Sequence, residues 1–145
     1  MAFKGVLSGG GFGIFAGNGG LLSPIADTSG PFSSLQGTAI NSLGAVAFGA
    51  DLRTGGSLIL TGSGGPLTTI AEVSGLFGGT SINDRGVVAF ATNPTTPGAG
   101  VFTGSGGPLT TIVALNGSDL FQVTGHSIND AGAWLFRRPF RQEVS

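Results

Sequence analysis

Thr61–Ile70 reads TGSGGPLTTI, and the same ten residues recur at Thr103–Ile112, 42 positions further along the chain. A weaker copy, AGNGGLLSPI, occupies Ala16–Ile25 and begins 45 positions before Thr61. Self-similarity at a fixed period of about 20–50 residues is the signature of repeat architectures. We therefore expect the chain to consist of three copies of one structural unit.

A second marker follows each of these copies. Three tetrads share the pattern Asn-x-x-Gly, and their asparagines are spaced by 42 and 46 positions. In a tight turn the asparagine side chain can bond the backbone two residues on, and glycine can supply a positive φ. The pattern predicts a structural turn in every repeat, formed by Asn41 and Gly44, Asn83 and Gly86, and Asn129 and Gly132.

Phenylalanine keeps the same register, since nine of the eleven fall in three columns of the repeat. A low-complexity chain has no reason to hold its large side chains at such a period, so each column predicts one packing position. The expected core positions are Phe3, Phe48, Phe90 and Phe136; Phe15, Leu60 and Phe102; and Phe32, Phe77 and Phe121.

Short strands fill the space between the turns. Ala45–Phe48 and Val87–Ala91 alternate small and large residues at period two, which is typical of strands, and three further strand-like segments follow in each period. If Val46 and Phe48 face one side, Ala47 faces the other, so a bulky face would meet a neighbour's small face. Four strands per 42–46 residues match one propeller blade.

The predicted fold class is all-β, with three tandem four-stranded antiparallel repeats as β-propeller blades; the alternative is an open β-repeat stack or filament. The expected repeats span about 3–48, 49–90 and 91–136 within a domain of 1–136, and 137–145 is a basic C-terminal tail. Closed propellers have about 4–8 blades, so three repeats leave two end faces to be covered.

Composition narrows the function classes. The net charge is −1 and only 9% of the residues are charged, which provides no broad basic field for nucleic acid. The chain has no cysteine, which excludes disulfides and thiolate metal sites. No apolar run is long enough for a signal-peptide core or for a membrane helix, so we expect no membrane span.

Candidate catalytic and metal-binding groups are sparse. His126 is the only histidine, and we expect a structural role for it; a triad with Ser127 and Asp119 or Asp130 would lack a nucleophile elbow. Asp84 and Asp130 could in principle bind calcium, but one carboxylate per turn favours turn capping. The TGSGGP segments lack the Lys-Ser/Thr of a phosphate loop. We expect no enzymatic activity, no metal and no cofactor.

The motif Asn-x-x-Gly-x-x-Ala-Phe is intact at Asn41–Phe48 and at Asn83–Phe90, and Asn129–Phe136 carries Leu135 in place of alanine. It resembles the tandem NxxGxxAF repeat of many bacterial, notably cyanobacterial, surface proteins of the variable-anchor type. The resemblance implies propeller-type repeats, export to the cell surface and no enzymatic activity.

The expected function is a non-catalytic structural or assembly module that self-associates. A homodimer with six blades is favoured, and a trimer or a filament is the alternative. The candidate oligomer contacts are Trp134, Leu135 and Phe140, because the last repeat is bulkiest at its edge and Phe140 could anchor the tail. The alternative function is a carbohydrate- or protein-binding, lectin-like propeller with a glycan as its ligand.

Overall fold

The computed structural model describes residues 1–74, 77–92, 98–115, 125–132 and 134–137, and within them the regular structure is entirely β, with no helix. The strands are β1 (Ala2–Val6), β2 (Phe12–Ala16), β3 (Ser23–Asp27), β4 (Phe32–Ile40), β5 (Val46–Leu52), β6 (Ser57–Gly62), β7 (Thr68–Val73), β8 (Phe77–Ile82), β9 (Val88–Thr92), β10 (Gly100–Gly104), β11 (Thr110–Ala114), β12 (Gly125–Ile128) and β13 (Trp134–Arg137). The all-β prediction is confirmed for these residues.

The strands form four antiparallel sheets in chain order. The described sheets are β1-β2-β3, β4-β5-β6-β7, β8-β9-β10-β11 and β12-β13. Neighbouring strands within each sheet are also neighbours in sequence, so every sheet is a simple meander. The expected four strands per unit therefore hold for the two central sheets, whereas the flanking sheets have three and two described strands.

The sheets are offset from the sequence period. Each Asn-x-x-Gly turn closes a hairpin inside a sheet, as Asn41–Gly44 does between β4 and β5. The strand before the turn therefore pairs with the strand after it, and the sheets that begin with β4, β8 and β12 each take their first strand from the end of the preceding period. Equivalent register shifts recur at Ile14/Phe15, Ile59/Leu60 and Val101/Phe102, so the three larger sheets share one internal geometry.

The core lies between stacked sheets. Val46 and Phe48 on β5 are fully buried in a cluster with Ile14 of β2, between the first and second sheets. Ala47 points to the opposite face and packs in a second cluster with Val88 and Phe90 of β9. Bulky residues of one sheet thus meet the small face of the preceding sheet, which is the packing that the period-two alternation predicts.

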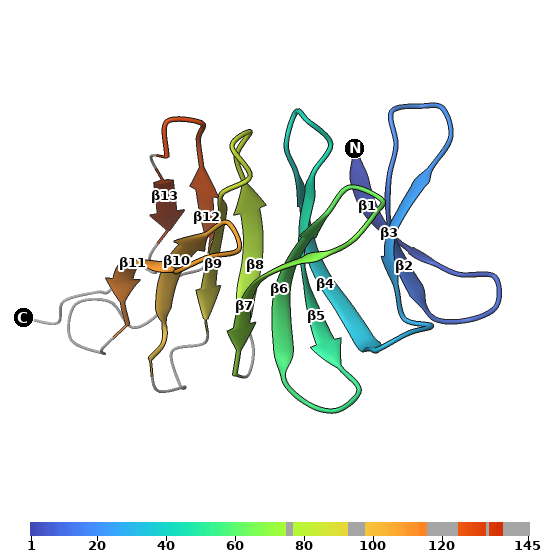
Figure 1. Cartoon of the computed structure of the whole chain (residues 1–145), viewed down its shortest axis with the longest axis horizontal. Coiled ribbons are helices and arrows are strands. Elements are labelled where there is room, and N and C mark those ends of the chain that lie inside the picture. Colours follow the sequence, from blue (N-terminus) through green and yellow to red (C-terminus); the bar gives the residue numbers. More distant parts are fainter. Residues whose placement is uncertain (75–76, 93–97, 116–124, 133, 138–145) are drawn as a thin grey trace, which may run out of the picture.

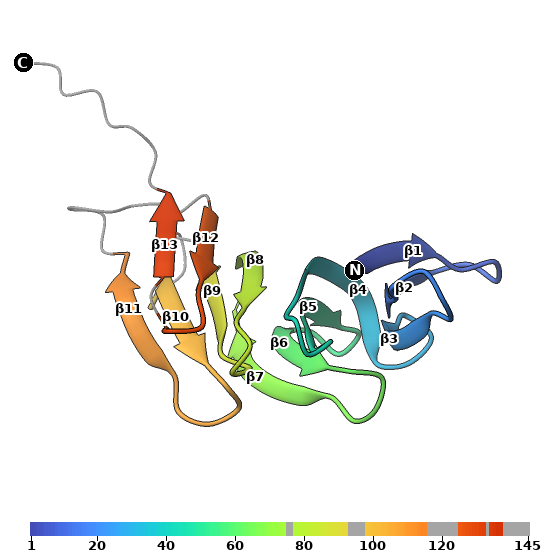
Figure 2. The same cartoon turned by 90° about the horizontal axis from the view of Figure 1, so that it is seen from above.

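Figures 1 and 2 show the sheets following one another in an open row, with β1–β3 at one end and the strands β10–β13 at the other. The view from above shows that the row bends and does not close on itself (Figure 2). The Asn-x-x-Gly turns of the two central sheets lie on the same side of the row (Figure 1). Successive turns are therefore side by side, and a hydrogen bond joins Asn41 to Asn83.

Candidate functional site

The asparagine turns have a shared internal geometry. The Oδ1 atom of Asn41 accepts hydrogen bonds from the backbone N–H groups of Leu43 and Ala45, at 3.1 and 2.9 Å. The N–H of Gly44 donates to the carbonyl of Asn41, and Gly44 has a φ of +85°, which L side chains rarely adopt. The turn therefore uses both members of the motif, the asparagine as a backbone acceptor and the glycine for its conformation.

The second turn repeats these bonds. The Oδ1 atom of Asn83 accepts from the N–H groups of Arg85 and Val87, at 3.0 and 2.9 Å, and Gly86 has a φ of +78°. In the third turn the N–H of Gly132 donates to the carbonyl of Asn129, and Gly132 has a φ of +81°.

Hydrogen bonds also join one turn to the next. The Nδ2 group of Asn41 donates to the carbonyl of Asn83 at 3.0 Å, and that of Asn83 donates to the carbonyl of Asn129 at 3.0 Å. The asparagines are 42 and 46 positions apart, so these bonds connect different sheets. We call this series of bonds, from Asn41 through Asn83 to Asn129, the asparagine ladder. It has one direction, because the earlier turn donates and the later turn accepts.

The residue after each asparagine adds a second series in the same direction. The N–H of Ser42 donates to Asp84 Oδ1 at 2.7 Å, and the Ser42 hydroxyl donates to Asp84 Oδ2. The N–H of Asp84 in turn donates to Asp130 Oδ1 at 2.8 Å. The hydrogen bonds from the side chain and backbone of Ser42 lower the pKa of Asp84. These aspartates accept bonds from the preceding turn, and no group of three or more His, Asp or Glu among the described residues could hold a metal ion.

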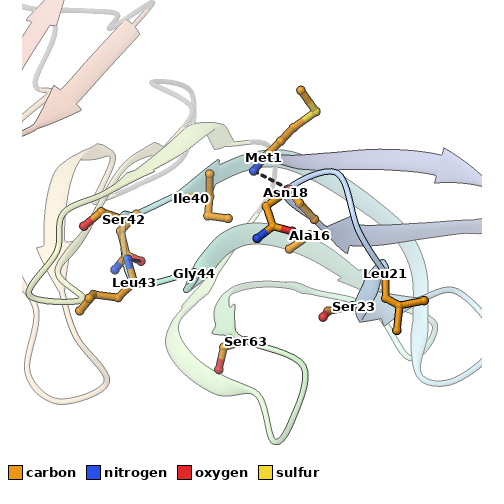
Figure 3. A pocket seen from close by; sticks show the side chains of 12 residues that line it. Met1, Ala16, Asn18, Leu21, Ser23, Ile40, Ser42, Leu43, Gly44 and Ser63 are labelled. Carbon is orange, nitrogen blue, oxygen red and sulfur yellow. Dashed lines mark hydrogen bonds between the residues drawn. The ribbon is translucent and has the colours of Figure 1, made fainter.

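A hollow of about 460 Å³ lies beside the first turn, on the side that faces the first sheet. Figure 3 shows Ser42 and Leu43 on one side of it and Met1, Asn18 and Leu21 on the other. The amino group of Met1 donates to the carbonyl of Gly17 at 2.9 Å and fixes the start of β1 at the rim. The Asn41 turn lies beside the Asn83 turn, on the side of the preceding sheet. The hollow occupies the equivalent place beside the Asn41 turn.

His126 is a contact between sheets. Its Nε2 atom lies 3.0 Å from the carbonyl oxygen of Ala89 in β9. At the equivalent position of the previous repeat, the Thr80 hydroxyl donates to the carbonyl of Ala47 at 3.3 Å. Burial lowers the pKa of His126, and its Nδ1 atom is buried without a hydrogen-bond partner. The residue therefore takes the place of a threonine in the stack, as a neutral imidazole.

This burial predicts a pH dependence of stability. Because the native pKa of His126 lies below its ordinary value of about 6.5, the unfolded chain binds more protons as the pH falls below that value. The free energy of unfolding should therefore decrease as the pH falls through the ordinary histidine range near about 6.5, and it should level off below the native pKa. Thermal unfolding of the wild type and of His126→Thr would measure this, and the variant should lose the dependence. The lowered pKa of Asp27 and Asp84 keeps their titration below this window.

The expected core positions differ in exposure. Phe48, Phe90, Leu60 and Phe32 are buried, at 0, 1, 2 and 7% exposure. The others that the structure describes are partly buried and lie in ring contacts, Phe3 with Phe15 at 5.8 Å between centroids and Phe90 with Phe102 at 5.6 Å.

Several expected core and contact positions have side chains outside the described residues. Trp134, Leu135 and Phe136 lie on β13, where their backbones pair with Ile128, Ser127 and His126. Phe77 lies on β8, and the structure does not describe its side chain or those of β13. Phe121 and Phe140 lie outside the described residues. The role of Trp134, Leu135 and Phe140 as oligomer contacts stays a prediction.

Sequence reasoning did not find the asparagine ladder. It treated each turn as a local cap, because spacing shows that turns are equivalent and not that they are adjacent. One signal was present: the aspartates that follow Asn83 and Asn129 carry acceptors that another turn can use.

Comparison of the chain with protein families, with curated proteins and with solved structures gave no match. In the parts of the chain that the structure describes, there is no helix long and apolar enough to cross a membrane.

Proposed function

We propose that the chain is a non-catalytic assembly module that self-associates, with its sheets as the blades of a β-propeller ring completed by a second copy. The observation that supports this most is the asparagine ladder. The same donor and acceptor groups join the second sheet to the third and the third to the fourth. Since the contact is modular and directional, another sheet can be added by the same bonds.

The ends of the row support the same proposal. The first and last sheets have three and two described strands, against four in the central sheets. Sheet edges and exposed sheet faces favour pairing with another chain unless something covers them. Each chain provides three asparagine turns, so two copies would provide six, a number within the usual range of about 4–8 blades.

The polar groups of the site also support assembly. Asn41 and Asn83 each use their side-chain oxygen to hold their own turn and their nitrogen to bond the next one. The carboxylates of Asp84 and Asp130 accept N–H groups from the preceding turn. These side chains therefore act as connections between sheets.

A lectin-like function is the second candidate, because polar side chains line the hollow and could bond sugar hydroxyls. They are Asn18, Ser23, Ser42 and Ser63. A glycan array separates the two functions: reproducible binding to one sugar class would favour the lectin, and its loss in Ser42→Trp would place the sugar in the hollow.

The mass of the chain in solution tests the proposed function. Size-exclusion chromatography with light scattering should give twice the chain mass of 14.2 kDa. The mass should stay constant over a tenfold dilution from a micromolar stock. A folded monomer at every concentration would overturn the proposal, and a mass that grows with concentration would replace the ring with a filament.

A further inference from the structure

One edge of the first sheet is available for another strand. β1 pairs with β2 and with no other described strand. Its equivalents in the next two sheets each lie between two strands, β5 between β4 and β6, and β9 between β8 and β10. The position next to β1 is the one that β4 and β8 fill in their own sheets. An exposed edge of this kind accepts an added strand through backbone hydrogen bonds.

β12 matches the strand that would fill this position. Three segments run into an asparagine turn in the same way, Thr38–Ile40 at the end of β4, Thr80–Ile82 in β8 and His126–Ile128 in β12. Their middle residues face the residue before the repeat phenylalanine on the paired strand. These cross-strand partners are Ala39 and Ala47, Ser81 and Ala89, and Ser127 and Leu135.

β1 and β13 are equivalent strands. Ala2 and Phe3 of β1 occupy the repeat positions of Leu135 and Phe136 of β13. Both strands are short, with five and four residues. β12 can therefore pair with either one in the same register, which would set Ser127 opposite Ala2.

The hollow adds independent support, because it lies where the turn after the added strand would come. Asn41 and Ser42, which line it, belong to the turn whose equivalents accept bonds from an earlier turn. Three of the seven exposed large hydrophobic side chains in the described chain also line it: Met1, Leu21 and Leu43, which are 80, 96 and 76% exposed. Such a gathering of exposed apolar groups around a polar turn is typical of an interaction site.

We propose, building on the self-association proposed above, that the copies join by strand exchange. β12 of one copy pairs with β1 of the other in place of its own β13, and the Asn129–Gly132 turn enters the hollow. The Asn129 amide then donates to the carbonyl of the partner's Asn41, for which one of its two N–H groups is enough. The exchange is reciprocal, so the asparagine ladder runs through six turns and returns to its start.

Engineered cysteines test this exchange in a chain that has none of its own. Ala2→Cys with Ser127→Cys places one thiol on β1 and one on β12, at opposite ends of the row (Figure 1). Cα atoms of opposed residues in antiparallel strands are about 4.5–5.5 Å apart, within reach of a disulfide. Under mild oxidation most of the chain should become a covalent dimer on a non-reducing denaturing gel, with a disulfide between positions 2 and 127 in peptide mapping.

Two matched variants are the controls. Ala39→Cys with Ala47→Cys occupies the same cross-strand position in the second sheet and should form a disulfide within one chain. Ser127→Cys with Leu135→Cys should lock β12 onto β13 and shift the light-scattering mass to that of a monomer.

The outcomes separate this proposal from the proposed function. The strand exchange alone is overturned if the wild type has the mass of a dimer but the Ala2→Cys/Ser127→Cys variant forms no disulfide between chains. This holds where the Ala39→Cys/Ala47→Cys control oxidises under the same conditions. A dimer that survives the lock of β12 onto β13 does the same. A monomeric wild type overturns the self-association on which both rest.

Discussion

Replacing Phe48 by alanine should lower the free energy of unfolding by about 3–5 kcal/mol, the usual cost of removing a buried phenylalanine ring. Phe48 is fully buried between the first and second sheets, in a cluster with Ile14, Leu35 and Leu60. The cavity would open in the interface between sheets, so it should weaken both the sheet and its stacking. Urea unfolding followed by circular dichroism would measure the change.

Phe12→Ala is the matched control for this prediction. Phe12 is 41% exposed, and its ring lies 4.3 Å from the Lys4 ammonium at the surface of the first sheet. Its loss should cost less than half as much. Equal effects of the two substitutions would contradict the placement of the core between the sheets.

The second large effect is expected at Asn83, the middle member of the asparagine ladder. Asn83→Asp keeps an oxygen for the N–H groups of Arg85 and Val87 but removes the donor to the carbonyl of Asn129. It also places a carboxylate next to that carbonyl, at a side chain that is only 3% exposed. The free energy of unfolding should fall by about 2–4 kcal/mol at neutral pH.

Part of this loss should be recovered near pH 4, where the new carboxyl group binds a proton and can donate again. Thr54→Asp introduces a carboxylate at an exposed position outside both the ladder and the hollow, and it should change stability by less than about 0.5 kcal/mol. Thermal unfolding at the two pH values would measure both variants. If Asn83→Asp were as mild as Thr54→Asp, the ladder would not be holding the sheets together.

The sequence predicted the strands because local chemistry decides them. The Asn-x-x-Gly pattern identified turns whose glycines have a positive φ, and the alternation of Val46, Ala47 and Phe48 identified a strand buried on both faces. These features depend on neighbouring residues, which a repeat displays several times. The all-β class followed directly from them.

The boundaries of the sheets were harder to predict. A period of 42–46 residues has no natural starting point, and the expected repeat ends at 48 and 90 fall inside β5 and β9. The Asn41–Gly44 turn is short enough to form only a hairpin, so β4 pairs with residues of β5 on both sides of position 48.

The contacts between sheets could not be read from the sequence. The bond from Asn41 to Asn83 exists because stacking brings two equivalent turns side by side. His126 likewise takes the position of Thr80 against the preceding sheet, although the two side chains differ in size and chemistry. Both features depend on the spacing of whole sheets.

Subunit mixing tests the central claim, self-association, most directly. Equal amounts of unlabelled and ¹⁵N-labelled chain would be unfolded together, refolded and weighed by native mass spectrometry. The account predicts three dimers in a ratio of about 1:2:1, with the middle mass belonging to a mixed pair. Two monomer masses and no mixed species, from a sample that retains its β-sheet circular dichroism, would contradict it.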